Sequence, residues 1–241
     1  MTIKRKVLII VSVLIIAIGM GFILYSPCSN AVFNIKQNSI IEDYNKTFNS
    51  GSGNHQMKTK LKLQQLKQDV KNYNHQIYID GQKNFYLSSV QRSSPLNLYN
   101  YGFQNNVYGY IVIPKIPLKM SIYLGADDYN MSLGAAVLGG SSIPNGGNNT
   151  NSVIAGHCGY GGCDYFRYIE TLEREDVVNI VIPFGSKLYK VINKKIIEPN
   201  DCQSLKIVKN KDLITLMTCY PYPTNKKRIC IFCEAVSPRD S

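Results

Sequence analysis

The chain has 241 residues, no tryptophan and a formal net charge of +11. Its lysines are scattered and form neither an arginine-rich face nor a nucleic-acid motif, so we expect no nucleic-acid partner and attribute the charge to work beside an anionic surface. The seven cysteines are an odd number, which excludes complete pairing in internal disulfides.

An uncharged apolar run occupies residues 7–25, which is long enough to span a bilayer. The basic residues Lys4–Lys6 precede it, and because positive residues favour the cytoplasmic side, we expect a cytoplasmic N-terminus. A cleaved signal peptide is the alternative, but Ser26-Pro27-Cys28 lacks a clean small-x-small cleavage site and the apolar run is long for a signal. We therefore predict a single-pass protein of the cell membrane, anchored through residues 7–25, with the rest of the chain extracellular.

Two helices are predicted after the anchor, over residues 34–48 and 58–78, with Gly51–Asn54 between them. In the second helix apolar residues recur at steps of three and four, which is typical of a helix with one buried face. These residues are Leu63, Leu66, Val70, Tyr73 and Ile77. We expect a helical arm that packs on the domain or spaces it from the membrane, and partner binding by this face is the alternative. His55 and His75 are predicted on solvated faces and not as metal ligands.

Residues 79–106 are polar, aromatic and irregular. The segment is too long for an ordinary connection, and loops of this length are frequently functional. A plain surface loop is the alternative, and the residues alone leave both open.

Short apolar segments separated by glycine, proline and asparagine begin at Tyr108 and continue almost to the C-terminus. This spacing is typical of a mostly antiparallel β-barrel. The predicted strands cover residues 108–113, 119–124, 135–138, 152–157, 177–184, 187–195, 212–218 and 228–236, with a short helix near 165–172. The chain is thus predicted to be mostly β, and the predicted divisions are a cytoplasmic tip and anchor at 1–29, a helical arm at 30–78, a loop at 79–106 and the barrel at 107–241.

Three reactive side chains stand at the ends of predicted strands. Cys219 ends one buried strand, Arg228 begins the next, and His157 follows the apolar run Val153–Gly156. A cysteine thiolate is a strong nucleophile, a nearby histidine can act as general acid and base, and a guanidinium can stabilise an oxyanion. The pattern therefore predicts a cysteine–histidine catalytic site.

The segments around these residues resemble the sortases, which are cysteine transpeptidases of Gram-positive bacteria. The resemblance is carried by TLMTC at 215–219, by Arg228, and by His157 in the sequence Ala-Gly-His. The stretches Tyr108–Ile116 and Leu138–Gly147 are similar to the class C, or pilin-type, branch. The resemblance covers roughly residues 85–236 and implies a sortase-like antiparallel barrel with short helices.

The resemblance also implies the chemistry. Cys219 would attack the scissile carbonyl of an LPxTG-like sorting signal and form a thioester, with His157 as general acid and base and Arg228 as the oxyanion or substrate stabiliser. An amine acceptor would release the product, so neither a metal nor an organic cofactor is expected. For the pilin type the acceptor implied is a pilin lysine, and attachment of surface proteins to cell-wall peptide is the alternative.

In pilin-type sortases the region of residues 79–106 is a lid that usually carries Asp-Pro-aromatic. The best match here is Ser94-Pro95-Leu96, in which the carboxylate and the aromatic ring are both replaced. We therefore expect a lid at Ser94, Pro95 and Leu96 that is held by apolar contacts. The change weakens the assignment to the pilin type.

Other interpretations are less favoured. A papain-like hydrolase is disfavoured because the cysteine follows the histidine here. A zinc pair at Cys230 and Cys233 is disfavoured because an offset of three residues along a strand places them on opposite faces. Cys158, where the family usually has arginine, is interpreted as a tolerated small residue, with a reactive thiol as the alternative. A non-enzymatic anchored β-domain that binds wall components remains as a third class.

Overall fold

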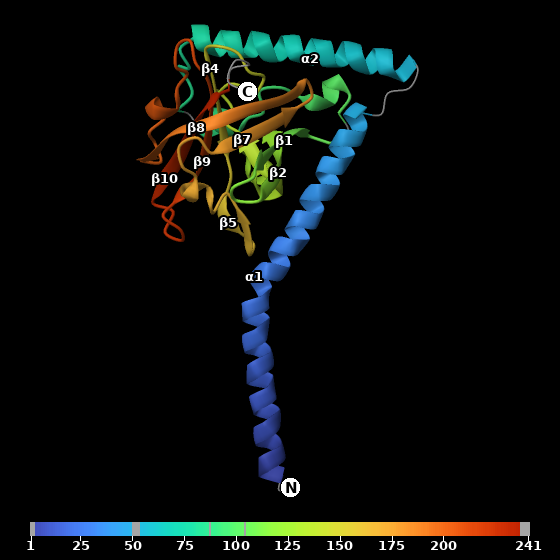
Figure 1. Ribbon diagram of the computed structural model, residues 1–241, viewed down its shortest axis with the longest axis vertical. Coiled ribbons are helices and arrows are strands. Elements are labelled where there is room, and N and C mark those ends of the chain that lie inside the picture. The colour runs from blue at the N-terminus through green and yellow to red at the C-terminus, as the bar shows by residue number, and fades with distance from the viewer. Residues whose placement is uncertain (1–2, 50–53, 87, 104, 237–241) are drawn as a thin grey trace.

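The computed structural model describes residues 3–49, 54–86, 88–103 and 105–236. A long N-terminal helix leads to a β-barrel, and a second helix lies across one end of that barrel (Figure 1). The helices are α1 (Ile3–Asn49), α2 (Asn54–Ile79), α3 (Ser88–Arg92) and α4 (Asp128–Leu133), with 3-10 turns η1 (Leu98–Tyr101), η2 (Ile169–Thr171) and η3 (Gln203–Leu205). The strands are β1 (Val107–Ile113), β2 (Leu118–Leu124), β3 (Ala135–Val137), β4 (Thr150–Ala155), β5 (Cys158–Tyr160), β6 (Cys163–Tyr165), β7 (Val177–Ile182), β8 (Gly185–Ile197), β9 (Asp212–Tyr220) and β10 (Lys227–Ala235).

Eight of the strands in these ranges close into a barrel in the order β1-β2-β3-β4-β9-β10-β8-β7. The pairings β2–β3 and β4–β9 are parallel, and the other pairings are antiparallel. The predicted barrel is confirmed, and it is mixed because β3 and β4 each have one parallel neighbour. Closure leaves no exposed sheet edge in the barrel, which protects the strands from pairing with other chains.

Two apolar clusters lie on the two faces of the barrel wall. The interior cluster includes Ile111, Ile154, Leu216 and Ile231, all fully buried. The outer cluster consists of Phe85, Leu138, Val153, Ala155, Ile197, Leu205 and Cys230, with Met217 packed against it. Neighbouring residues of one strand thus enter different clusters, as alternation along a strand requires. Cys230 lies in the outer cluster and Cys233 in the interior one, so the predicted placement of these thiols on opposite faces is confirmed.

Helix α2 covers one end of the barrel, where Leu66 and Val70 are fully buried in the interior cluster and Leu63 and Tyr73 pack against it. The predicted apolar face is therefore a packing face. Burying one such aliphatic side chain contributes roughly 1.5–3 kcal/mol to folding. His75 is exposed, as predicted. The side chain of His55 and most of the predicted separator, residues 51–53, lie outside the described residues.

Helix α1 runs without interruption through the predicted division at residues 29 and 30. Pro27 removes one backbone donor, but no second helix breaker follows it, so the helix continues to Asn49. Its C-terminal half packs on β2, where Gln37 donates to the Leu133 carbonyl and accepts from the Ser121 amide and hydroxyl. Within the described ranges, α1 is the one helix long and apolar enough to cross a membrane.

The predicted strand 152–157 ends earlier than expected, because β4 stops at Ala155. The short helix predicted near residues 165–172 is also corrected, since Tyr165 belongs to β6 and only the 3-10 turn η2 follows. The hairpin β5–β6 was not predicted. Its strands are too short for an alternating pattern, and the glycines between them indicate only a turn.

Candidate active site

Cys219 and Arg228 occupy opposed positions on the antiparallel strands β9 and β10. Alternation places both side chains on the face of Met217 and Cys230, which belong to the outer side of the barrel wall, and not on the face of Leu216. Both residues are partly exposed. The thiol and the guanidinium therefore share one accessible face at the end of the strand pair, as the sequence predicts.

His157 reaches the same edge from β4. The parallel pairing of β4 with β9 sets Ala155 opposite Met217, and His157 and Cys219 each follow two residues later. Two hydrogen bonds extend the pairing: the Gly156 amide donates to the Met217 carbonyl at 3.0 Å, and the Thr218 hydroxyl donates to the Gly156 carbonyl at 2.7 Å. Because parallel strands end on the same side, the register brings histidine and cysteine to one edge.

The imidazole of His157 lies among aromatic rings of the β5–β6 hairpin. The Tyr160 ring stacks on it with centroids 4.6 Å apart, and the Tyr165 ring meets it edge-on at 5.7 Å. Phe166 donates its amide to the His157 carbonyl at 2.9 Å, which fixes the backbone. Partial burial lowers the pKa of His157 below its ordinary value near 6.5, and the negative charge of Asp128 opposes this effect.

Gly156 is required by this packing. A Cβ atom at this position would lie 2.6 Å from the Phe166 ring. Any larger residue before His157 would displace either the ring or the strand end.

Cys158 follows the histidine and is buried. Burial raises the pKa of its thiol, and the nearby Cys219 raises it further. A thiol that is held protonated and covered is a poor nucleophile. The geometry therefore favours the interpretation of Cys158 as a small packed residue over that of a second reactive thiol.

Arg228 is tied to the loop that joins β9 and β10. One terminal nitrogen, Nη1, donates to the Asn225 carbonyl at 3.2 Å and to the Lys227 carbonyl at 2.9 Å. Across this loop the guanidinium of Arg167 lies 4.2 Å from the Tyr222 ring centroid, a cation–π contact. The first two contacts orient the Arg228 side chain, and the cation–π contact fixes the β9–β10 loop that follows Cys219.

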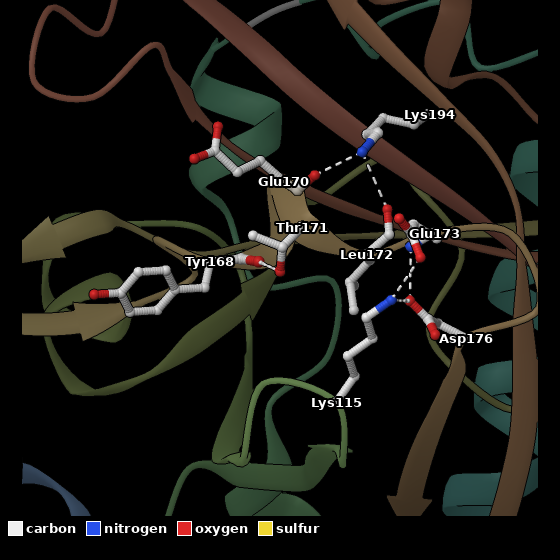
Figure 2. Close-up of polar contacts among 8 residues, drawn as sticks. All are labelled: Lys115, Tyr168, Glu170, Thr171, Leu172, Glu173, Asp176 and Lys194. Atoms are coloured by element: carbon white, nitrogen blue, oxygen red, sulfur yellow. Dashed lines mark hydrogen bonds and ion pairs between the residues drawn. The ribbon is translucent and has the colours of Figure 1, made fainter.

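The segment after β6 is fastened to the barrel by two lysines (Figure 2). Lys194 donates to the carbonyls of Glu170 and Leu172 at 2.6 and 3.1 Å. Lys115 forms an ion pair with Asp176 at 2.9 Å. The segment around η2 is thus held through its backbone by Lys194 and through a carboxylate side chain by Lys115.

A cavity of about 510 Å³ lies between this segment and the strands β8–β10. It is lined by Glu170, Thr171, Lys194, Ile196, Tyr220 and Ile229. Tyr220 and Ile229 directly follow Cys219 and Arg228 in the chain, so the cavity adjoins the ends of β9 and β10 that carry these two residues.

The predicted lid residues are held largely by their own segment. The Ser94 hydroxyl donates to the Leu96 carbonyl at 2.6 Å, Leu96 packs partly buried against the interior cluster, and Pro95 lines a separate cavity of about 310 Å³. Next to them Arg92 forms an ion pair with Asp128 at 2.5 Å. This ion pair joins the segment before the predicted lid to α4. Asp128, the first residue of α4, is also the residue whose negative charge opposes the lowering of the His157 pKa.

Four residues around the site were missed by sequence reasoning, namely Asp128, Tyr160, Tyr165 and Arg167. Tyr160 and Tyr165 lie within eight residues of His157, and their aromatic character was a usable signal. Asp128 and Arg167 carry no such signal, because only the fold brings them near. In the described part of the chain, no group of three or more histidine, cysteine or acidic residues is placed to hold a metal ion.

Comparison with known proteins places the chain in one family. A sortase domain model matches residues 111–236. The crystal structure of sortase C from Clostridium perfringens SM101 is 30% identical, covering 83% of this chain and 99% of that one with a TM-score of 0.65. A structure of C. perfringens sortase C with the C-terminal cell wall sorting motif is also 30% identical, covering 83% and 98%, with a TM-score of 0.66.

Sortase D of Bacillus subtilis (strain 168) is 27% identical over 114 residues, which span 47% of this chain and 54% of that relative. The aligned part is thus about half of the curated relative's length. The domain match, in contrast, extends over more than half of the 241 residues and contains β4, His157, β9 and β10. The chain belongs to the sortase family of cysteine transpeptidases.

Proposed function

We propose that this protein is a membrane-anchored sortase that cleaves an LPxTG-like sorting signal and transfers the acyl part to an amine, joining pilin subunits. The observation that carries the proposal is the register of β4, β9 and β10. It brings His157, Cys219 and Arg228 to one accessible edge of the barrel.

In the first step the Cys219 thiolate attacks the scissile carbonyl carbon of the sorting signal. The C–N bond breaks, the leaving amine takes a proton from the His157 imidazolium, and a thioester remains on Cys219. In the second step an acceptor amine attacks the thioester and gives its proton to the neutral His157. The thiolate leaves, an amide bond forms, and the enzyme returns to its starting state.

Arg228 supports both steps by donating hydrogen bonds to the oxyanion that forms on the attacked carbonyl. Its terminal nitrogen Nη1 is held by the Asn225 and Lys227 carbonyls, which orients the planar guanidinium before substrate arrives. A donor that is already oriented loses little further freedom during the reaction.

The anchor supports action at the outer face of the membrane. Residues 7–25 begin directly after the basic residues Lys4–Lys6, which favours a cytoplasmic N-terminus. The same helix continues along the outside of the barrel, where Ile41 is fully buried. An anchor that is kept explains this continuous packing better than a cleaved signal does.

Similarity to class C structures and the segment at 79–106, with Ser94, Pro95 and Leu96 as a lid, support a pilin lysine as the acceptor. One observation favours the second candidate, attachment to cell-wall peptide. Ser94 stands where pilin-type relatives carry the acidic lid residue, so the usual carboxylate contact of that lid cannot form.

The test uses the full chain in detergent micelles with sorting-signal peptides and two acceptors, a lysine-bearing pilin peptide and a cell-wall peptide amine. Mass spectrometry should find a thioester on Cys219 and an amide-linked product with the pilin lysine. A product with the wall amine alone would select the second candidate. Cys219→Ala should form neither species and keep the wild-type circular dichroism spectrum, and turnover in that variant would remove Cys219 from the mechanism.

A further inference from the structure

The N-terminal helix α1 is attached to the hairpin that surrounds His157. Just beyond the apolar run 7–25, Asn30 and Asp164 form two hydrogen bonds: the Asn30 amide donates to the Asp164 carboxylate, and the Asp164 backbone amide donates to the Asn30 side-chain carbonyl, both at 2.8 Å. The Ser26 hydroxyl donates to the Gly162 carbonyl at 3.1 Å. The hairpin strand β5 lies beside the middle of α1, where that helix reaches the barrel (Figure 1).

The fit between helix and hairpin is close at Gly162. Its backbone has φ +81°, and a Cβ atom there would lie 2.7 Å from the Tyr25 ring and 3.0 Å from the Ser29 hydroxyl. The Cys163 thiol also lies 3.4 Å from the Ser29 carbonyl. Four consecutive residues of the hairpin, 161–164, are thus in polar contact with the same helix.

Tyr165 connects this attachment to the imidazole. The Phe33 ring of α1 packs on the Tyr165 ring with centroids 4.5 Å apart, and the same Tyr165 ring meets His157 edge-on at 5.7 Å. The Tyr165 hydroxyl donates to the Ser132 carbonyl of α4 at 2.7 Å. The tyrosine is therefore held by α1 and α4 while it contacts His157.

The backbone of Tyr165 is also unusual. It adopts φ +46°, in the left-handed region that bulky residues rarely enter. Such a conformation persists only where surrounding contacts enforce it, and these outliers gather at functional sites. Here the enforcing contacts are the rings of Phe33 and His157 and the bond to Ser132.

We propose that Tyr165 is a positioning residue for His157, and that α1 holds it in place through Phe33 and Asn30. The membrane anchor then has a second role, because the helix that crosses the bilayer also sets the orientation and solvent exposure of the general acid and base. This inference rests on the proposed function for the role of His157. The attachment of α1 to the β5–β6 hairpin rests only on the contacts described above and does not depend on the proposed function.

Titratable groups around the imidazole include Tyr160 and Tyr165 on the hairpin and Asp128 on α4, and Cys219 on β9 lies at the same edge. Tyr165 carries no charge near neutral pH, since burial raises its pKa to about 12. Loosening the hairpin would therefore change mainly the desolvation of His157. Water would reach the ring, and the pKa of His157 would rise toward its ordinary value.

The experiment measures this pKa by NMR in the full chain in detergent micelles. The chain has three histidines, so the signals can be resolved, and His157→Gln identifies the one of interest. The variants are Phe33→Ala and Asn30→Ala on the helix, and Tyr165→Leu and Tyr165→Phe on the hairpin. Ile35→Ala is the matched control, because its side chain on the same helix is 70% exposed.

We expect Phe33→Ala, Asn30→Ala and Tyr165→Leu to raise the pKa of His157 and to lower kcat by about tenfold or more, since small misplacements of a catalytic group are costly. KM should stay near its wild-type value. Tyr165→Phe should raise the pKa less than Tyr165→Leu does, because it keeps the ring contacts and loses only the bond to Ser132. Ile35→Ala should change nothing.

The inference is overturned if Phe33→Ala and Asn30→Ala fold, by circular dichroism, and keep the wild-type pKa of His157 and the wild-type kcat. Should Tyr165→Leu fail to fold, these two helix variants still decide the question. The NMR titration needs no substrate. If the variants show the expected pKa shifts but the wild-type protein transfers no peptide, the proposed function is overturned and the positioning role stands.

Discussion

Cys219 and Arg228 are partner residues across the antiparallel strands β9 and β10. Opposed residues of such a pair have Cβ atoms about 4.5–5.5 Å apart and point to the same face. The loop of residues 221–226 between the strands therefore places a guanidinium beside a thiol. The Arg228 side chain is in turn held by the Asn225 and Lys227 carbonyls, so this loop also orients the donor.

Replacing Arg228 by lysine tests whether the planar donor matters beyond its charge. We expect kcat for peptide cleavage to fall by about a hundred- to a thousandfold, the effect of losing one oxyanion donor. An ammonium cannot reproduce the fork of the guanidinium, and it would lose the fixed contact to the loop carbonyls. Lys226→Arg, in the same exposed loop, is the control. Near-normal rates in Arg228→Lys would reduce the role of Arg228 to bulk electrostatics.

Removing the charge of Asp128 should lower the pKa of His157 further. The Asp128 carboxylate stabilises the imidazolium of His157 and thereby opposes the lowering of its pKa by burial. Asp128→Asn removes this opposition, so the imidazolium fraction at neutral pH decreases. Arg92→Gln is the matched opposite, because Arg92 pairs with Asp128 and partly cancels its charge, so we expect the pKa to rise. NMR titration of His157 measures both. Since Arg92 and Asp128 are largely exposed, the two shifts should shrink at high salt, and shifts of the same sign would contradict this account.

Small thiol reagents should distinguish Cys219 from Cys158. Cys158 is 7% exposed and burial raises the pKa of its thiol, whereas Cys219 is partly exposed. We expect iodoacetamide at neutral pH to modify Cys219 and to leave Cys158 unmodified in the folded protein, as read by peptide mass spectrometry. The unfolded protein, in which both thiols are accessible, is the control. Modification of Cys158 at the rate of Cys219 would establish it as a second reactive thiol.

The proposed lid at Ser94, Pro95 and Leu96 should be weakly closed. Leu96 is only partly buried, and the ion pair between Arg92 and Asp128 is exposed, a type that contributes about 0–1 kcal/mol. We expect Leu96→Ala to speed alkylation of Cys219 by tenfold or less, since a factor of ten corresponds to about 1.4 kcal/mol.

The measurement of the lid is made with Cys158 replaced by serine. Peptide mass spectrometry reads the alkylation of Cys219 separately from that of the exposed Cys28 and the partly exposed Cys163 and Cys202. Tyr99→Ala, an exposed position after the lid, is the control. An acceleration far above tenfold would mean a firmly held lid. Equal rates in wild type and Leu96→Ala would show that Leu96 holds no lid over the thiol.

The sequence by itself predicted the strands of the barrel, although not the hairpin β5–β6, and the candidate reactive residues. A buried strand needs apolar residues at regular positions, and Thr215–Cys219 and Arg228–Val236 carry that pattern next to a thiol and a guanidinium. The apolar face of α2 was predictable for the same reason, since Leu66 and Val70 recur at helical spacing. These features depend on residues near each other in the chain, and local periodicity records them.

Only the tertiary structure decided how distant segments meet. The parallel pairing of β4 with β9 sets His157 level with Cys219, although 62 positions separate them, and no local pattern specifies that register. The contact of Phe33 with Tyr165 joins the long helix α1 to a hairpin of three-residue strands, which are too short to show a period. The ion pair of Asp128 with Arg92 joins α4 to α3 on the surface, and only the folded arrangement brings the Asp128 charge near His157. Such contacts arise from the packing of whole elements against each other, which depends on shape and burial across the molecule and not on neighbours in sequence.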